Sequence, residues 1–186
     1  IPELYRGSTL IRRLRLERLQ VVGAKDAEGR WNLGRLVRPR PPSPPNGRPP
    51  RLIAFEQIEL VDSTIAFRDQ LMFGAARVPR RFEHLNGLLS FDWRGAAWRL
   101  ALTRAAWRGS DPELPMDRLT GVIATDEQGW TFEALRVQTP RSTYTVDGTV
   151  RRDNGATQLA LAVNAERFAF QEWGGMLGGL RSIAVE

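Results

Sequence analysis

An alternating apolar pattern recurs along this chain, and it constrains the fold more than any other feature. In LRLERLQVV, residues 14–22, apolar side chains occupy every second position, with a change of phase after Leu16. IAFEQIELV, residues 53–61, repeats this ladder with the same change of phase after Phe55. Period two is typical of a β-strand with one apolar face, and a change of phase indicates a bulge or bend. We therefore predict two copies of one bent strand unit.

The segment between the two copies has a different character. Asn32 is placed to cap one or two helical turns that carry Leu33 and Leu36. Residues 39–50, PRPPSPPNGRPP, follow, and seven of these twelve residues are proline. Proline lacks the backbone donor that a sheet needs and holds the chain extended, so this segment predicts an exposed loop.

A second repeat fills the later part of the chain. Three segments each carry a glycine inside a strand pattern (Gly87, Gly121, Gly148), then an aspartate (Asp92, Asp126, Asp153), then a second glycine (Gly95, Gly129, Gly155). Glycine accepts positive φ and aspartate bonds the backbone of a turn, so this order is typical of β-hairpins. We predict three successive hairpins in an antiparallel meander.

Within this meander the apolar side chains define strand faces. Trp98, Leu100 and Leu102 share one face of their strand, and Leu159, Leu161 and Val163 share one face of another. In the middle hairpin Trp130 and Phe132 take one parity, whereas Leu135 and Val137 take the other. The middle hairpin is therefore predicted to contain a phase slip of its own.

The end segment, residues 166–186, breaks the alternation. Phe168, Trp173 and Leu177 have helical spacing, but four glycines between residues 174 and 179 weaken a helix by up to about 1 kcal/mol each. We predict a loop with helical tendency whose apolar side chains pack against the end of the sheet; contact with a membrane is the alternative.

Composition excludes several classes of site. The 186 residues include no cysteine and one histidine, His84, so thiolate and polyhistidine metal sites are absent. Glu83 precedes His84, but adjacent strand residues point to opposite faces and do not act as a pair. No catalytic or nucleotide-binding motif occurs. We expect no enzyme activity, no metal site and no cofactor.

The net charge of +6 comes almost entirely from arginines, which alternate with apolar residues in ones and twos. That spacing favours a solvated face over a nucleic-acid arm, which groups its charges. Six tryptophans among arginines are also compatible with stacking on nucleic acid or sugars, although packing against a sheet explains them as well. We expect no nucleic-acid partner. A basic domain that binds nucleic acid or polysaccharide remains the least favoured of three hypotheses, and the other two are given below.

The order of these features resembles the AsmA family of Gram-negative envelope proteins. In that family a strand pair leads to a "dGrwNL..L" segment and then to a second pair ending in "i.frD". The matching residues here are Asp26, Gly29, Arg30, Trp31, Asn32, Leu33 and Leu36, and then Ile65, Phe67, Arg68 and Asp69. Residues 118–150 look like the strand pattern shared by AsmA-like and TamB-like proteins. The resemblance covers most of residues 10–165.

The resemblance implies an elongated β-sheet curled into a groove with an apolar interior, similar to the chorein-type lipid-transfer proteins. It implies a periplasmic domain whose parent chain is anchored in the inner membrane, with roles in phospholipid transport and outer-membrane biogenesis. The chain lacks the amino-terminal membrane helix usual in the family, and it begins at Ile1, so we expect a piece of a longer protein.

These observations lead to one hypothesis and its rival. We expect residues 1–186 to be a single all-β groove of repeated hairpins with one or two short helices, acting as a non-enzymatic lipid conduit. Its partners would be phospholipids or other acyl-chain lipids and, in addition, envelope proteins. The rival is a closed β-sandwich that serves as a structural or protein-interaction module. The candidate groove residues are Leu14, Leu16, Ile53, Phe55, Ile58, Leu60, Ile65, Phe67, Trp98, Leu100, Leu102, Phe132, Leu159, Leu161 and Val163.

Overall fold

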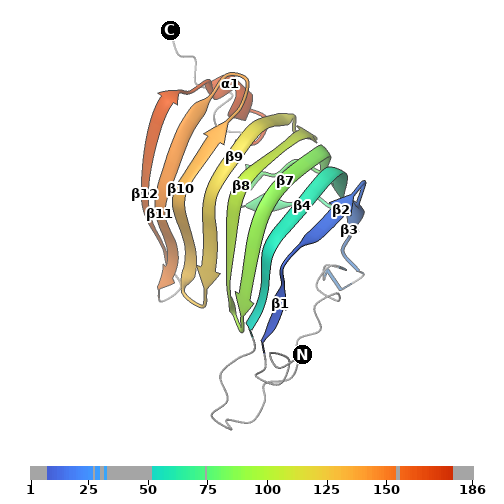
Figure 1. Cartoon of the computed structure of the whole chain (residues 1–186). Coiled ribbons are helices and arrows are strands. Elements are labelled where there is room, and N and C mark those ends of the chain that lie inside the picture. Colours follow the sequence, from blue (N-terminus) through green and yellow to red (C-terminus); the bar gives the residue numbers. More distant parts are fainter. Residues whose placement is uncertain are drawn as a thin grey trace.

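The chain folds into one large, open and curled β-sheet (Figure 1). The computed structural model describes residues 8–26, 28–29, 32, 52–73, 75–153 and 156–177. The sheet contains β1 (Thr9–Ile11), β2 (Leu14–Glu17), β3 (Gln20–Gly23), β4 (Leu52–Phe67), β7 (Arg81–Arg94), β8 (Ala97–Ser110), β9 (Leu114–Asp126), β10 (Gly129–Gln138), β11 (Thr143–Asp153) and β12 (Ala156–Arg167). A small hairpin, β5 (Met72–Phe73) and β6 (Ala76–Arg77), forms a separate two-stranded sheet, and α1 (Phe170–Trp173) follows the last strand.

The predicted all-β class is confirmed, with one short helix in the described part of the chain. The strand order is β1-β4-β7-β8-β9-β10-β11-β12, with β2 and β3 also paired to β4. From β4 to β12 every neighbouring pair is antiparallel. The proline-rich segment 39–50, as well as Leu33 and Leu36, lies outside the described residues.

The two copies of the ladder pair in a way that the sequence does not predict. β1, β2 and β3 run parallel to β4, with Leu14 opposite Ile58 and Val21 opposite Ile65, so the sheet is mixed rather than wholly antiparallel. Parallel pairing needs a crossover of a dozen or more residues, and the connection from Gly23 to Leu52 is long enough to provide it. The first copy is thus two short strands, β2 and β3, which follow β1 along the edge, whereas the second copy lies in one long strand.

The predicted change of phase is confirmed in both copies. Arg18, between β2 and β3, has φ +51°, and the register of β4 against β7 shifts between Phe55 and Ile58. Further positive φ values occur at Asp62 (+46°) in β4 and at His84 (+50°) in β7. Bulges bend a strand and increase its twist, so this row of irregular positions contributes to the curl of the sheet.

The three predicted hairpins are also confirmed. Two residues separate β7 from β8, β9 from β10, and β11 from β12. The Asp126 carboxylate accepts hydrogen bonds from the backbone N–H groups of Gln128 (2.8 Å) and Gly129 (3.0 Å), as turn chemistry requires. Asp92 is different: it lies within β7 opposite Arg99, so its prediction as a turn residue is wrong.

The slip predicted in the middle hairpin lies in β10. Its register against β11 shifts between Phe132 and Leu135, and Ala134 has φ +45°. The Ala134 N–H, displaced from the ladder, donates to the Asp147 carboxylate at 2.6 Å. A side chain from β11 therefore satisfies the backbone donor that the bulge releases.

The most buried part of the molecule sits at one end of the sheet. Leu114, Met116 and Val137 are each at most 5% exposed, and Trp173 and Met176, from α1 and the residues after it, pack against them. The predicted packing of the end segment against the sheet is confirmed for Trp173 and Met176, whereas Phe168 and Phe170 are exposed. Residues 178–186 lie outside the described range.

Candidate functional site: the apolar face of the sheet

Strand register gathers apolar side chains from seven strands on one surface, which we call the apolar face. Cross-strand partners have side chains on the same side of a sheet. Phe55 lies opposite Phe91, Phe91 opposite Leu100, and Leu100 opposite Ile123. The run continues through Phe132 and Gly148 to Leu161, so one row crosses the sheet from β4 to β12.

A contiguous row of aromatic rings marks this face. The ring centroids of Phe55 and Phe91 are 6.5 Å apart, those of Phe91 and Trp98 are 6.1 Å apart, and those of Trp98 and Trp130 are 5.4 Å apart. These separations are typical of aromatic pairs that attract one another beyond simple burial. Four strands thus contribute one connected apolar strip.

The face is only partly covered. Of the candidate residues, Leu102 is buried (8% exposed), and those on β2, β4, β8 and β10 are otherwise half-buried. In the part of the chain that the structure describes, the second sheet is only the two-stranded hairpin of β5 and β6, which bonds a residue after α1 through the Arg77 N–H and the Met176 carbonyl at 2.8 Å. These residues therefore do not form the closed sandwich of the rival hypothesis.

The candidate residues occupy three zones of the apolar face. A central zone on β4, β8 and β10 holds Ile53, Phe55, Ile58, Leu60, Trp98, Leu100, Leu102 and Phe132. Leu14 and Leu16 lie beside Ile58 and Leu60 at one edge, while Ile65 and Phe67 lie further along β4, with Phe67 packed edge-on to Phe82 at 6.4 Å. Leu159, Leu161 and Val163 line the opposite edge and are 68%, 43% and 59% exposed.

Several residues of the face were not among the candidates. They are Leu89, Phe91, Trp93, Ile123, Trp130 and Val150. Their alternation in β7, β9 and β10 is visible in the sequence. Parity within one strand, however, does not say on which side of the common sheet its apolar side chains lie. Cross-strand register supplies that information.

A buried polar cluster closes one end of the apolar face. The Glu172 carboxylate of α1 accepts hydrogen bonds from Thr139 Oγ1 (2.5 Å), Ser142 Oγ (2.7 Å) and the Arg141 N–H (2.8 Å). Thr139 and Ser142 are 1% and 0% exposed. Burial, with the nearby Glu172 carboxylate, raises the pKa of Tyr144, which packs beside Trp173. Glu172 therefore fixes α1 over the loop between β10 and β11.

Replacing Glu172 with alanine is expected to lower the free energy of unfolding by on the order of 3 kcal/mol, because two buried hydroxyls lose a charged acceptor. Urea denaturation followed by far-ultraviolet circular dichroism measures the loss. Glu166→Ala is the matched control: Glu166 is 62% exposed and bonds Arg136 at 2.8 Å, and removal of such a surface pair costs roughly 1 kcal/mol or less. Equal losses in the two variants would contradict the assigned role of Glu172.

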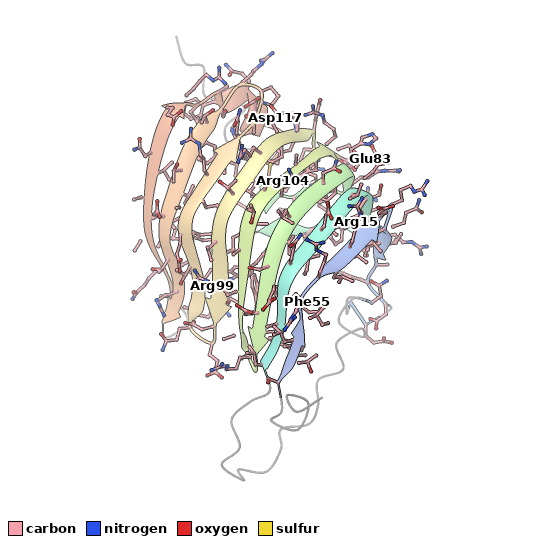
Figure 2. All side chains as sticks on the ribbon, in the orientation of Figure 1. Arg15, Phe55, Glu83, Arg99, Arg104 and Asp117 are labelled. Atoms are coloured by element: carbon pink, nitrogen blue, oxygen red, sulfur yellow. The ribbon has the colours of Figure 1, made fainter. Side chains whose placement is uncertain are left out.

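The opposite face carries paired charges. Arg99 holds Glu133 through two hydrogen bonds of 2.9 and 2.8 Å, and Arg15 reaches Glu59 on the neighbouring strand at 3.1 Å. The hydrogen bond to Arg99 lowers the pKa of Glu133, and the same bond raises the pKa of Arg99. Arg15, Arg99 and Arg104 lie far apart over the sheet rather than in one patch (Figure 2). The alternating arginines thus form a solvated charged face.

A hollow of about 420 Å³ lies apart from the aromatic row, where β4, β7 and β8 shift register. Its charged lining comes from Glu59, Arg104, Asp117 and Arg118. Both carboxylates are engaged, because Glu59 bonds Arg15 and Asp117 bonds Arg108 at 3.1 Å. The hollow is therefore lined by paired charges and also by Leu60 of the central zone.

Two residues of the family-like motif hold the ends of neighbouring strands. The side chain of Asn32 accepts from the Ala24 N–H and donates to the Val22 carbonyl, each at 2.9 Å. Asp69 accepts from the Lys25 N–H at 2.8 Å. Asn32 thus folds back on the end of β3, and any helical turns carried by Leu33 and Leu36 fall outside the described residues.

His84 has a partner that sequence reasoning missed. Its Nδ1 lies 2.8 Å from Asp62 Oδ1 on the adjacent strand, and both side chains are more than half exposed. Asp62 and His84 are the bulged residues of β4 and β7, so the bulges turn both side chains toward each other. Among the described residues no cluster of three His, Asp or Glu side chains has metal-binding geometry.

The part of the chain that is described contains no helix of the length and apolarity that a membrane crossing requires. Comparison of the whole sequence with protein-family models, with curated proteins and with solved structures gives no match. The geometry of the apolar face, together with the motif resemblance, is therefore the basis for assigning a function.

Proposed function

We propose that the apolar face binds the acyl chains of lipids and that this domain is a non-enzymatic lipid conduit of AsmA-like type. The observation that carries the proposal is the row of apolar positions from β4 to β12, which is half-buried on β4 to β10, passes Gly148 on β11 and is exposed on β12. A sheet face of this size ordinarily packs against a second layer. An acyl chain can take the place of that layer, because it has no polar group that would need a hydrogen-bond partner on the apolar face.

Energetics support a lipid occupant. Removing a methylene from water is worth about 0.8 kcal/mol, so a sixteen-carbon chain gains up to about 10 kcal/mol on a fully covering surface. The face gives successive apolar contacts of similar strength, and moving a chain by one position exchanges one contact for another. Such a surface favours sliding over fixed capture.

The wider setting follows the family resemblance. We place the domain in the periplasm of a Gram-negative envelope, in a parent protein anchored in the inner membrane and serving outer-membrane biogenesis. Phospholipids are the proposed cargo. The paired charges on the other face, such as Arg99 with Glu133, keep that side in water.

Site-specific photocrosslinking tests this proposal. A photoreactive phenylalanine at Phe55 or at Trp98 is expected to crosslink to phospholipid during expression, because both rings belong to the aromatic row. Native mass spectrometry of the unmodified chain is expected to show bound lipid. Lipid extraction followed by mass analysis identifies the cargo.

Ala101 provides the matched control position. It lies in β8 close to Trp98, but it pairs with Ser90 and Val122 on the charged side of the sheet. The same photoreactive group at position 101 is expected to give little lipid adduct. Clean protein without lipid and without crosslinks from positions 55 and 98 would rule the proposal out, and equal crosslinking from position 101 would argue for nonspecific adsorption.

A further inference from the structure

The last strand of the sheet is exposed along its whole length. All twelve residues of β12 have exposed side chains, and Leu159, Leu161 and Val163 are among the most exposed large apolar residues of the described chain. β12 pairs with β11 on one side, and no described segment pairs with its outer side (Figure 1). Its outer backbone groups therefore form a regular row of donors and acceptors.

β12 lacks the features that usually block such an edge. Exposed edges are normally short, charged, bulged or interrupted by proline. Residues 156–165 contain no charge and no proline, and the register of β12 from Ala156 to Ala165 is unbroken. The opposite edge, in contrast, is broken into β1, β2 and β3 and carries exposed arginines at 12, 13, 15 and 18.

We propose that β12 pairs antiparallel with β12 of a second copy of this chain, to give a symmetric dimer with one continuous sheet. This inference concerns assembly and does not depend on the proposed lipid function. A two-fold axis at Leu161 places Leu161 opposite its own copy and Leu159 opposite Val163. On the other face it places Gln158 opposite Asn164 and Ala160 opposite Ala162.

The central pairs of this register, from residue 158 to residue 164, are chemically matched. Large apolar side chains meet on the apolar face, small ones meet on the other face, and the two amides lie opposite each other. Directly opposed side chains in an antiparallel pair are about 4.5–5.5 Å apart at Cβ, so each match is a contact. A head-to-tail arrangement lacks this fit, because the broken β1–β3 edge cannot pair with the unbroken run of β12 from Ala156 to Ala165.

The symmetry also fixes how the two sheets relate. A two-fold axis perpendicular to the sheet keeps both apolar faces on the same side of the dimer. Residues 159, 161 and 163 of each copy would then lie within a shared apolar surface rather than at its margin. A partner strand in this register would cover part of the exposed surface of these side chains.

Light scattering coupled to gel filtration, over a dilution series of the purified chain, tests the proposal. The expected mass at the concentrated end is twice the 21.0 kDa of the chain. Leu161→Lys places two like charges side by side at the axis, so the mass is expected to halve. Leu10→Lys is the matched control, because Leu10 is also 43% exposed but lies on the opposite edge; this variant is expected to remain a dimer.

Single cysteines test the register independently, since the chain has none of its own. Under mild oxidation Leu161→Cys is expected to crosslink to its own copy, and Leu159→Cys is not. A mixture of Leu159→Cys with Val163→Cys is expected to give the mixed disulfide. Circular dichroism checks that each variant keeps its sheet.

Three outcomes would overturn the proposal. The first is a chain that stays monomeric at every concentration, which would leave β12 to a strand from another protein or from elsewhere in a longer chain. The second is a dimer that survives Leu161→Lys. The third is an assembly of more than two copies. Absence of the Leu161→Cys crosslink in a dimer would exclude the two-fold register.

Discussion

Replacing Gly148 with alanine is expected to lower the free energy of unfolding by 3 kcal/mol or more, on the order of the largest single-residue effects in a domain of this size. Gly148 lies in β11 with φ +131°, a backbone conformation that residues with a Cβ rarely adopt. A Cβ built there would lie 1.9 Å from the Ala160 carbonyl oxygen of β12. Strain at such φ values costs about 1–3 kcal/mol by itself, and the contact with β12 adds to it.

Gly87 is the matched control for this prediction. It is buried in β7 without positive φ, and a Cβ there would meet its nearest neighbour, the Arg104 carbonyl oxygen, at 3.7 Å, which is an ordinary contact. Gly87→Ala is expected to change stability by about 1 kcal/mol or less, with either sign. Urea denaturation of both variants gives the comparison. Equal destabilisation by the two substitutions would show that the close approach of β12 does not determine the effect at Gly148.

The three in-strand glycines show where sequence reasoning stops. Gly87, Gly121 and Gly148 occupy equivalent places in the repeat, so the pattern treats them alike. In the structure Gly121 and Gly148 have positive φ, at +119° and +131°, and approach the backbone of the next strand, whereas Gly87 does neither. The sequence pattern shows only that glycine is present. Whether the position requires glycine depends on its φ angle and on how closely the neighbouring strand approaches.

Most of the local architecture could be predicted, because its causes lie within a few residues of each other. Alternation specifies strands, an aspartate and a glycine specify hairpin turns, and a change of parity specifies a bulge, as Arg18 and Ala134 demonstrate. The parallel pairing of β2 with β4 could not be predicted in the same way. Its register, Leu14 opposite Ile58, differs from the repeat alignment, in which Leu14 corresponds to Ile53.

The candidate site was predictable to a similar extent. Parity placed Phe55 and Leu100 on apolar strand faces, but the row that joins them through Phe91 depends on pairing between distant segments. The closure of one end by Glu172 depends on hydroxyls some thirty residues away, at Thr139 and Ser142. Long-range contacts of this kind leave no periodic signal in a single sequence.

Introducing a carboxylate at the centre of the apolar face is expected to have the largest effect on lipid binding. Leu100 lies opposite Phe91 and Ile123, so Leu100→Glu places a charge in the middle of the row. An acyl chain crossing that position would remove water from the carboxylate without supplying a hydrogen bond, which costs several kcal/mol. Because each 1.4 kcal/mol corresponds to a tenfold change in affinity, the amount of co-purified lipid is expected to fall about tenfold or more.

The next residue along β8 separates this effect from general damage to the fold. Ala101→Glu adds the same side chain on the charged side of the sheet, opposite Ser90 and Val122, and is expected to retain lipid at the level of the parent chain. Leu100 is half-buried on an open face, so its glutamate can turn toward water in the lipid-free protein and the sheet should remain folded. Lipid extraction and native mass spectrometry measure the bound lipid, and circular dichroism reports the fold of both variants. If folded Leu100→Glu retains lipid, the lipid binds elsewhere than on the apolar face. If both variants lose lipid, binding depends on the total charge of the protein and not on which face of the sheet carries the added charge.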